Sequence, residues 1–94
     1  MRIELFNPGE FGKWFDALGP RSKARMAVLL QMLESATVPA PMPHGRHLGG
    51  GLHELRSRLG ERVYYSLNND TATILACGRK DTQQRDITRA RSRQ

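Results

Sequence analysis

The chain lacks the features that mark membrane, secreted and disulfide-stabilised proteins. Its 94 residues contain one cysteine, Cys77, so no internal disulfide can form, as expected in a reducing compartment. No apolar run approaches the roughly 20 residues that a membrane-spanning helix needs. The opening residues, Met-Arg-Ile-Glu-Leu-Phe, lack the apolar stretch of a signal peptide. We therefore expect one cytoplasmic domain, because a chain of this length has room for one core and not for two.

Motifs for metal, nucleotide or thiol chemistry are also missing. His44, His47 and His53 lie in or beside a Pro/Gly-rich segment, and no cysteine pair or second ligand cluster supports a metal site there. The glycines at 49–51 precede a predicted strand and are not followed by Lys-Ser/Thr, so they form no phosphate-binding loop. Cys77 lies in an apolar run and is expected in the core. We expect neither a metal nor a cofactor, although one histidine can still serve as an acid or base near neutral pH.

Acidic residues are scarce, and the excess of basic over acidic residues is unevenly distributed along the chain. Nine Asp/Glu stand against fifteen Lys/Arg, of which twelve are arginine, for a net charge of +6. Residues 45–94 hold ten basic and five acidic residues, whereas residues 1–44 hold five and four. Arginine pairs bidentately with phosphate and stacks on bases, so this composition favours a polyanion such as nucleic acid. An acidic protein partner or an ordinary solvated surface is the alternative.

The first 35 residues predict a strand and two helices. Met1–Phe6 alternates as a short strand, and Asn7-Pro8 has the form of a helix start. Gly19-Pro20 separates this helix from a second one over Arg21–Ser35, which suggests a helical hairpin. Each helix has an apolar stripe at helical spacing, predicted to face the core: Phe11, Trp14, Phe15 and Leu18, then Met26, Leu29, Leu30 and Leu33.

The segment Thr37–Gly51 is predicted to be a connection without secondary structure. It contains three prolines, Pro39, Pro41 and Pro43, followed by the glycines at 49–51. Such a composition is stiff in its first half and flexible in its second.

Three strands and a final helix are predicted after this connection. Residues 51–58, 62–67 and 71–77 read as strands. Asp81 with Gln84 resembles a capping box that opens the last helix, whose apolar stripe is thin. Three arginines at intervals of four form a basic ridge along this helix: Arg85, Arg89 and Arg93. The order β-α-α-β-β-β-α predicts an α+β fold with helices on a small antiparallel sheet.

Strand alternation places several chemically useful side chains on one sheet face. Arg56, Arg62 and Tyr64 share the face opposite the apolar set, and Lys80 follows the last strand. Such a face suits a phosphate backbone with a base stacked on the tyrosine. The alternative is a solvated face with an Arg–Glu54 pair. His53 is predicted on the other face.

Four segments together resemble the RelE/ParE toxin superfamily, in the branch of addiction-module killer proteins similar to HigB-type toxins. They are Gly51-Leu52-His53-Glu54-Leu55-Arg56, Arg62-Val63-Tyr64-Tyr65, residues 74–83 (Ile-Leu-Ala-Cys-Gly-Arg-Lys-Asp-Thr-Gln) and Asp86-Ile87-Thr88-Arg89-Ala90. With the Phe11–Leu18 helix the resemblance covers nearly the whole chain, and it implies a single RelE/ParE-like toxin domain over residues 1–94.

The resemblance implies the toxin of a type II toxin–antitoxin system that binds a helix-turn-helix antitoxin. RelE-like members enter the ribosome, cut mRNA by metal-free transphosphorylation, and so inhibit translation and arrest growth. Arg62 matches a strand arginine that would stabilise the phosphorane. Lys80 would do likewise or donate a proton, and Arg56 would hold the neighbouring phosphate. Further contacts to RNA are expected from Arg79, Arg85 and Arg89.

This chain departs from RelE at the acid/base positions. RelE has lysines where this chain reads Leu52-His53-Glu54, and a tyrosine where it has Ile87. His53 or Tyr64 is the candidate replacement. Two other functions follow from the same resemblance: a ParE-like inhibitor that binds DNA gyrase without catalysis, and a degenerate toxin that only binds its antitoxin.

Overall fold

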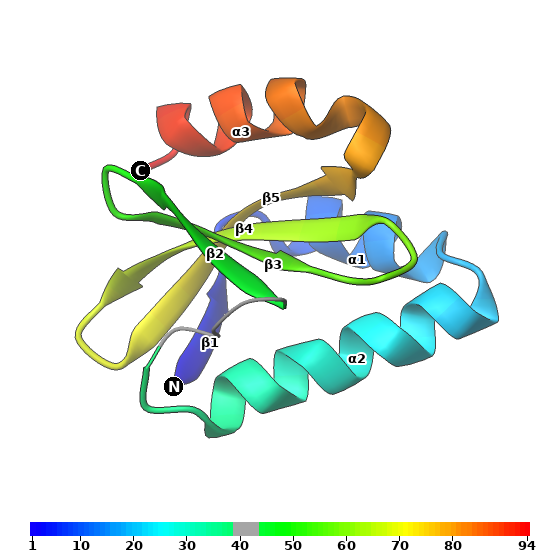
Figure 1. Cartoon of the computed structure of the whole chain (residues 1–94), viewed down its shortest axis with the longest axis horizontal. Coiled ribbons are helices and arrows are strands. Elements are labelled where there is room, and N and C mark those ends of the chain that lie inside the picture. Colours follow the sequence, from blue (N-terminus) through cyan, green and yellow to red (C-terminus); the bar gives the residue numbers. More distant parts are fainter. Residues whose placement is uncertain (39–43) are drawn as a thin grey trace.

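A five-stranded sheet organises the structure, a computed structural model that describes residues 1–38 and 44–94 (Figure 1). Its strand order is β1-β5-β4-β3-β2, and the predicted α+β class is confirmed. All neighbouring strands are antiparallel except β1 and β5, which pair in parallel, so the expected purely antiparallel sheet is corrected at this edge. The strands are β1 (Arg2–Leu5), β2 (Gly45–Gly49), β3 (Leu52–Arg56), β4 (Glu61–Asn68) and β5 (Thr71–Arg79).

Helices α1 (Pro8–Asp16) and α2 (Pro20–Ser35) cover one face of the sheet (Figure 1). Asn7 begins α1 as predicted, because its Oδ1 accepts a hydrogen bond of 3.1 Å from the Glu10 amide. The predicted stripes of both helices pack against the sheet, and their best-buried members are Met26, Leu29 and Leu33. This burial explains why two short helices hold their place.

Strand β2 corrects the prediction that Thr37–Gly51 is only a connection. Gly45–Gly49 pairs antiparallel with β3, with Gly45 opposite Leu55 and His47 opposite His53. The glycines at 49–51 form the tight turn between these strands and all have positive φ, a conformation that only glycine adopts at low cost. Sequence periodicity missed β2 because it has only one large apolar residue. The prolines at 39, 41 and 43 lie outside the described residues.

Helix α3 (Gln83–Ser92) covers the opposite face of the sheet (Figure 1). A single 3-10 turn, η1 (Lys80–Thr82), leads into it from β5. The predicted box between Asp81 and Gln84 is wrong: the hydroxyl of Thr82 accepts from the Arg79 amide at 3.3 Å and donates to the Arg79 carbonyl at 3.2 Å. The 3-10 turn shifts the start of the α-helix by one residue, because its N-cap is Thr82 and not Asp81.

The thin apolar stripe of α3 suffices to dock it. Ala90 is fully buried and Ile87 partly so, against a second apolar cluster that contains Leu52, Tyr64 and Leu75. The two faces of the sheet therefore carry separate cores, one under α1 and α2 and one under α3. Within the described ranges, no helix is both long and apolar enough to cross a membrane.

Candidate functional site

Strand register brings the three principal basic candidates to one end of the sheet. Arg56 on β3 lies opposite Arg62 on β4, which in turn lies opposite Gly78 on β5. The Lys80 amide donates to the Gly60 carbonyl at 2.9 Å, which ties the end of β5 to the β3–β4 turn. Lys80 itself is exposed. The sequence prediction that these residues share one region is supported by this register.

Arg62 is held by a buried network. Its side chain is 10% exposed, and its Nε lies 3.6 Å from Oε2 of Glu54, which is fully buried. Its Nη1 donates to the Gly60 carbonyl at 3.1 Å. The same Glu54 oxygen accepts a bond of 2.8 Å from Nε2 of Gln83, at the start of α3. The Arg–Glu54 pair is therefore present, but it is enclosed, and such a pair fixes a guanidinium more firmly than a surface pair does.

Tyr64 does not lie on an open surface. It is 0% exposed beneath α3, and burial, with the nearby Glu54 charge, raises the pKa of its hydroxyl. The prediction of an open sheet face with a tyrosine for base stacking is thus wrong for most of that face, because α3 covers it. The end that carries Arg56 and the exposed Lys80 extends beyond this cover.

His53 lies on the opposite face, as predicted. Its ring stacks on Tyr65 with centroids 5.2 Å apart and on His47 with centroids 4.6 Å apart. Burial lowers the pKa of His53, and the His47 charge lowers it further. The sheet itself separates His53 from Arg62, so the two do not form one site. In the part of the chain that the structure describes, no group of three His, Cys, Asp or Glu side chains is placed to hold a metal ion.

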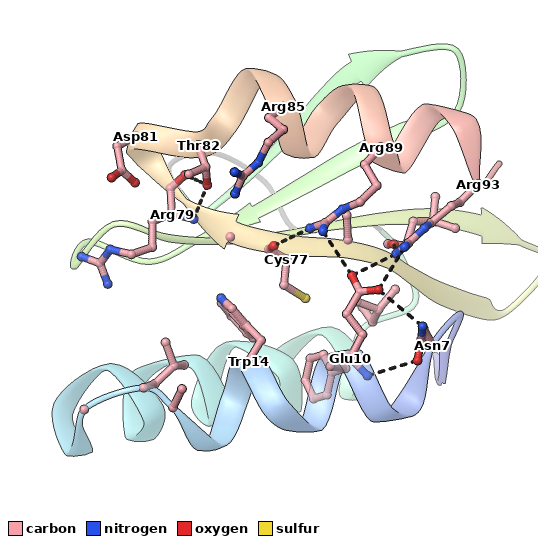
Figure 2. Close-up of a pocket in the computed structure, with 18 residues that line it drawn as sticks. Asn7, Glu10, Trp14, Cys77, Arg79, Asp81, Thr82, Arg85, Arg89 and Arg93 are labelled. Atoms are coloured by element: carbon pink, nitrogen blue, oxygen red, sulfur yellow. Dashed lines mark hydrogen bonds and ion pairs between the residues drawn. The ribbon is translucent and has the colours of Figure 1, made fainter.

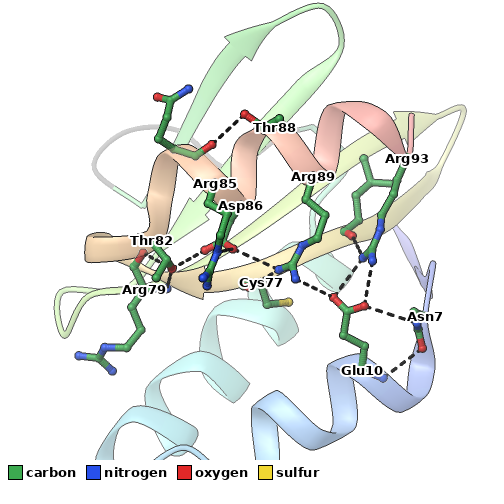
Figure 3. Close-up of polar contacts among 12 residues, drawn as sticks. Asn7, Glu10, Cys77, Arg79, Thr82, Arg85, Asp86, Thr88, Arg89 and Arg93 are labelled. Atoms are coloured by element: carbon green, nitrogen blue, oxygen red, sulfur yellow. Dashed lines mark hydrogen bonds and ion pairs between the residues drawn. The ribbon is translucent and has the colours of Figure 1, made fainter.

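The arginines expected to contact RNA have partners within the fold (Figure 3). Arg79 donates to the buried Glu61 carboxylate at 2.7 Å. Arg89 donates to the Cys77 carbonyl at 3.0 Å and to the buried Asp86 carboxylate at 3.2 Å. Arg85 is the most exposed of the three, with 75% of its side chain accessible and its Nε 3.8 Å from Asp86.

Two features of this region had little signal in the sequence. Gln83 was not a candidate, yet it holds Glu54 beside Arg62, and only the docking of α3 creates this contact. A groove of about 510 Å³ between α1 and α3, along β5, was not expected either (Figure 2). Cys77 lies on this groove as a partly buried residue, and burial raises the pKa of its thiol to about 12, so it is not a reactive thiolate.

Comparison with known families decides the assignment. The model of the family described as "Phage derived protein Gp49-like (DUF891)" matches residues 13–94. The chain belongs to the Gp49-like family. This family is related to the RelE/ParE toxins of toxin–antitoxin systems, so the predicted resemblance is confirmed at that level. No curated protein matches the Gp49-like chain.

Proposed function

We propose that this chain is the toxin of a type II toxin–antitoxin module and a ribosome-dependent mRNA endonuclease. The observation that carries the proposal is the enclosed Arg62, 3.6 Å from the buried Glu54, at the same sheet end as Arg56 and the exposed Lys80. A guanidinium fixed in advance stabilises charge that develops on a phosphate without reorganising during the reaction. Membership of the Gp49-like family supports the toxin assignment.

The proposed step is a transphosphorylation within the mRNA. The ribose 2′-oxygen passes its proton to a base that the ribosome supplies or positions and attacks the adjacent phosphorus, and the bond from phosphorus to the 5′-oxygen of the next nucleotide breaks. The products are a 2′,3′-cyclic phosphate and a 5′-hydroxyl. Arg62 stabilises the phosphorane charge, and Arg56 binds the neighbouring phosphate. Lys80, an exposed cation at this end, donates a proton to the leaving oxygen.

One observation favours a second candidate. Both proposed replacements for the missing RelE acid/base groups are displaced from this end, since Tyr64 is enclosed under α3 and His53 lies across the sheet. A chain without a general base suits a non-catalytic toxin that binds DNA gyrase, or a degenerate toxin that only binds an antitoxin. The ribosome would have to supply or position the base for the endonuclease.

The test maps mRNA cuts on translating ribosomes by primer extension. Arg62→Ala would leave the buried Glu54 without its ion-pair partner and cost about 3–5 kcal/mol of stability, so it tests folding as much as function. Lys80→Ala changes an exposed residue, and Arg62→Lys keeps the charge but loses the planar fork. Arg2→Ala is the matched control, because it removes one arginine from an exposed position on β1, at the far edge of the sheet.

We expect cuts within codons for the wild type and Arg2→Ala. Cutting should be at least about a hundredfold slower for Lys80→Ala, the loss typical of one acid/base group, and at least about tenfold slower for Arg62→Lys, which keeps the charge. Growth arrest without cuts would overturn the endonuclease and direct the search to gyrase. The absence of both growth arrest and cuts would support the degenerate toxin.

A further inference from the structure

The groove between α1 and α3 follows the free end of β5 (Figure 2). Strand β1 pairs with β5 only as far as Ile74, so, within the part of the chain that the structure describes, residues 75–79 have no neighbouring strand on that side. Part of the apolar lining comes from α1 and the turn after it, through Phe11, Trp14 and Leu18, and the rest comes from β5. In Figure 2 the indole of Trp14 projects from α1 into the groove. The groove has a volume of about 510 Å³, which is ample for several side chains of a ligand.

The edge of β5 in this groove is already protected. Arg93 donates to the Leu75 carbonyl at 2.8 Å, and Arg89 donates to the Cys77 carbonyl at 3.0 Å. An incoming strand would find these acceptors occupied, so strand addition is not the mode of binding that this groove offers. A partner would bind here by inserting side chains into the groove instead.

Charge divides the groove into two parts. At one end, Glu10 receives Arg93 at 2.9 Å and Arg89 at 3.4 Å. The buried Asp86 also receives Arg89, at 3.2 Å, so two carboxylates compensate these two arginines. At the other end Arg85 and Arg79 keep 75% and 54% of their side chains exposed. The groove is therefore an apolar channel with a neutral end and a rim of accessible guanidinium groups.

We propose that this groove binds a segment of the cognate antitoxin in which apolar side chains lie beside a carboxylate. The apolar side chains pack on Trp14 and Leu18, and the carboxylate pairs with Arg85. The identity of the partner rests on the proposed toxin–antitoxin function, whereas the chemistry of the segment rests on the groove itself. Burial of apolar area supplies affinity, and the charge pair supplies orientation.

A nucleic acid suits this groove less well. Glu10 stands in its wall and Asp81 on its rim, and both would repel successive phosphates. Two arginines of the groove, Arg93 and Arg89, already pair with Glu10 and donate to carbonyls of β5. The rim of the groove at Arg79 and Asp81 flanks Lys80, so the proposed antitoxin site borders the proposed RNA site.

Trp14 makes occupancy directly measurable, since it is the sole tryptophan of the chain. A naive library of 16-residue peptides displayed on phage is panned against the intact protein, and enriched peptides are synthesised and titrated while Trp14 emission is followed. We expect enriched sequences that combine apolar residues with Asp or Glu and that shift the emission. No ribosome or RNA is present, so an inactive endonuclease leaves this outcome unaffected.

Ala17→Glu provides the blocking variant. Ala17 is an exposed residue at the end of α1 that lines the groove, so a carboxylate there narrows the groove and repels an acidic ligand. Gln31→Glu is the control, with the same side chain on an exposed position of α2 that does not line the groove. We expect at least about tenfold weaker binding for Ala17→Glu and less than about twofold change for Gln31→Glu.

Three results would overturn the proposal. The first is the absence of enriched apolar–acidic peptides, and the second is equal binding to Ala17→Glu and the wild type. The third is a 12-nucleotide single-stranded RNA that shifts Trp14 emission and displaces the enriched peptides, which would assign the groove to nucleic acid.

Discussion

Gly78 and Asp86 approach each other so closely that no side chain fits between them. A Cβ on Gly78 would lie 1.8 Å from Oδ2 of Asp86 and 2.6 Å from its Cγ. Asp86 is 1% exposed and also receives Arg89. The absence of a side chain at this one position of β5 thus allows α3 to rest on the sheet with a carboxylate buried at the contact.

Gly78→Ala should therefore weaken the docking of α3. We expect a loss of about 1–3 kcal/mol in the free energy of unfolding, because either Asp86 or the helix must move to admit a methyl group. Urea denaturation followed by circular dichroism measures this. Gly12→Ala in α1 is the control, since a Cβ there meets nothing within 4 Å, and it should stabilise the protein by up to about 1 kcal/mol. Equal effects of the two variants would contradict the packing argument.

Glu10 should make stability depend on pH through its contacts with α3. The pKa of this carboxyl is held below its ordinary value of 4.5, chiefly by the hydrogen bond from Arg93. Its contribution is therefore present above pH 4.5 and is lost as the pH falls through the lower folded pKa. Glu10→Gln should cost about 0.5–1 kcal/mol at pH 7, a value reduced for the exposure of the pair, and almost nothing at pH 2.

Glu4→Gln serves as the control for this measurement. Glu4 pairs with Arg2 at 3.7 Å on an exposed part of β1, and an exposed pair contributes little. Denaturant titrations of both variants at several pH values between 7 and 2 give the comparison. If the free energies of unfolding of Glu10→Gln and the wild type differ by the same amount at every pH in this range, the protonation of Glu10 is not linked to stability.

His53 should destabilise the fold in mild acid. Burial, and to a smaller extent His47, lowers the pKa of His53 below 6.5, so the unfolded chain binds its proton at a higher pH than the folded chain does. Stability should fall as the pH drops below about 6.5 and level off below the folded pKa. In His53→Phe, which keeps a ring against Tyr65, this fall should be smaller. Melting temperatures at pH 7.5, 6.5 and 5.5 measure this fall in stability for both proteins. If the melting temperature depends on pH equally in His53→Phe and the wild type, other groups cause the fall.

Tyr64→Phe should leave mRNA cutting within about twofold of the wild type. The hydroxyl is enclosed beneath α3, and burial raises its pKa, so it stays neutral and out of contact with RNA. Such a change removes no charge stabilisation or proton transfer in the proposed step. Primer extension on translating ribosomes measures the rate, with far-UV circular dichroism to show that the variant is folded. A loss of a hundredfold or more would make Tyr64 part of the reaction and require α3 to move.

Much of the local structure followed from the sequence because its signals are local. The Asn7-Pro8 start predicted α1, and the spacing of Met26, Leu29 and Leu33 predicted the buried side of α2. Alternation correctly placed Arg62 and Glu54 on one face and His53 on the other. A short strand such as β2 has no comparable signal, since its glycines and polar residues become a strand only when β3 is beside it.

The sequence by itself determined the helices, four of the five strands and the faces of the residues on β3 and β4, because periodicity and capping depend on neighbours along the chain. The tertiary structure alone decided what covers each face. Alternation places Tyr64 and Arg62 together, but only the docking of α3 buries Tyr64 and leaves the end with Lys80 accessible. The groove beside Trp14 likewise exists only because residues far apart in the sequence, on α1 and α3, flank the free end of β5. Contacts of this kind depend on distances across the fold, and no local pattern of residues encodes them.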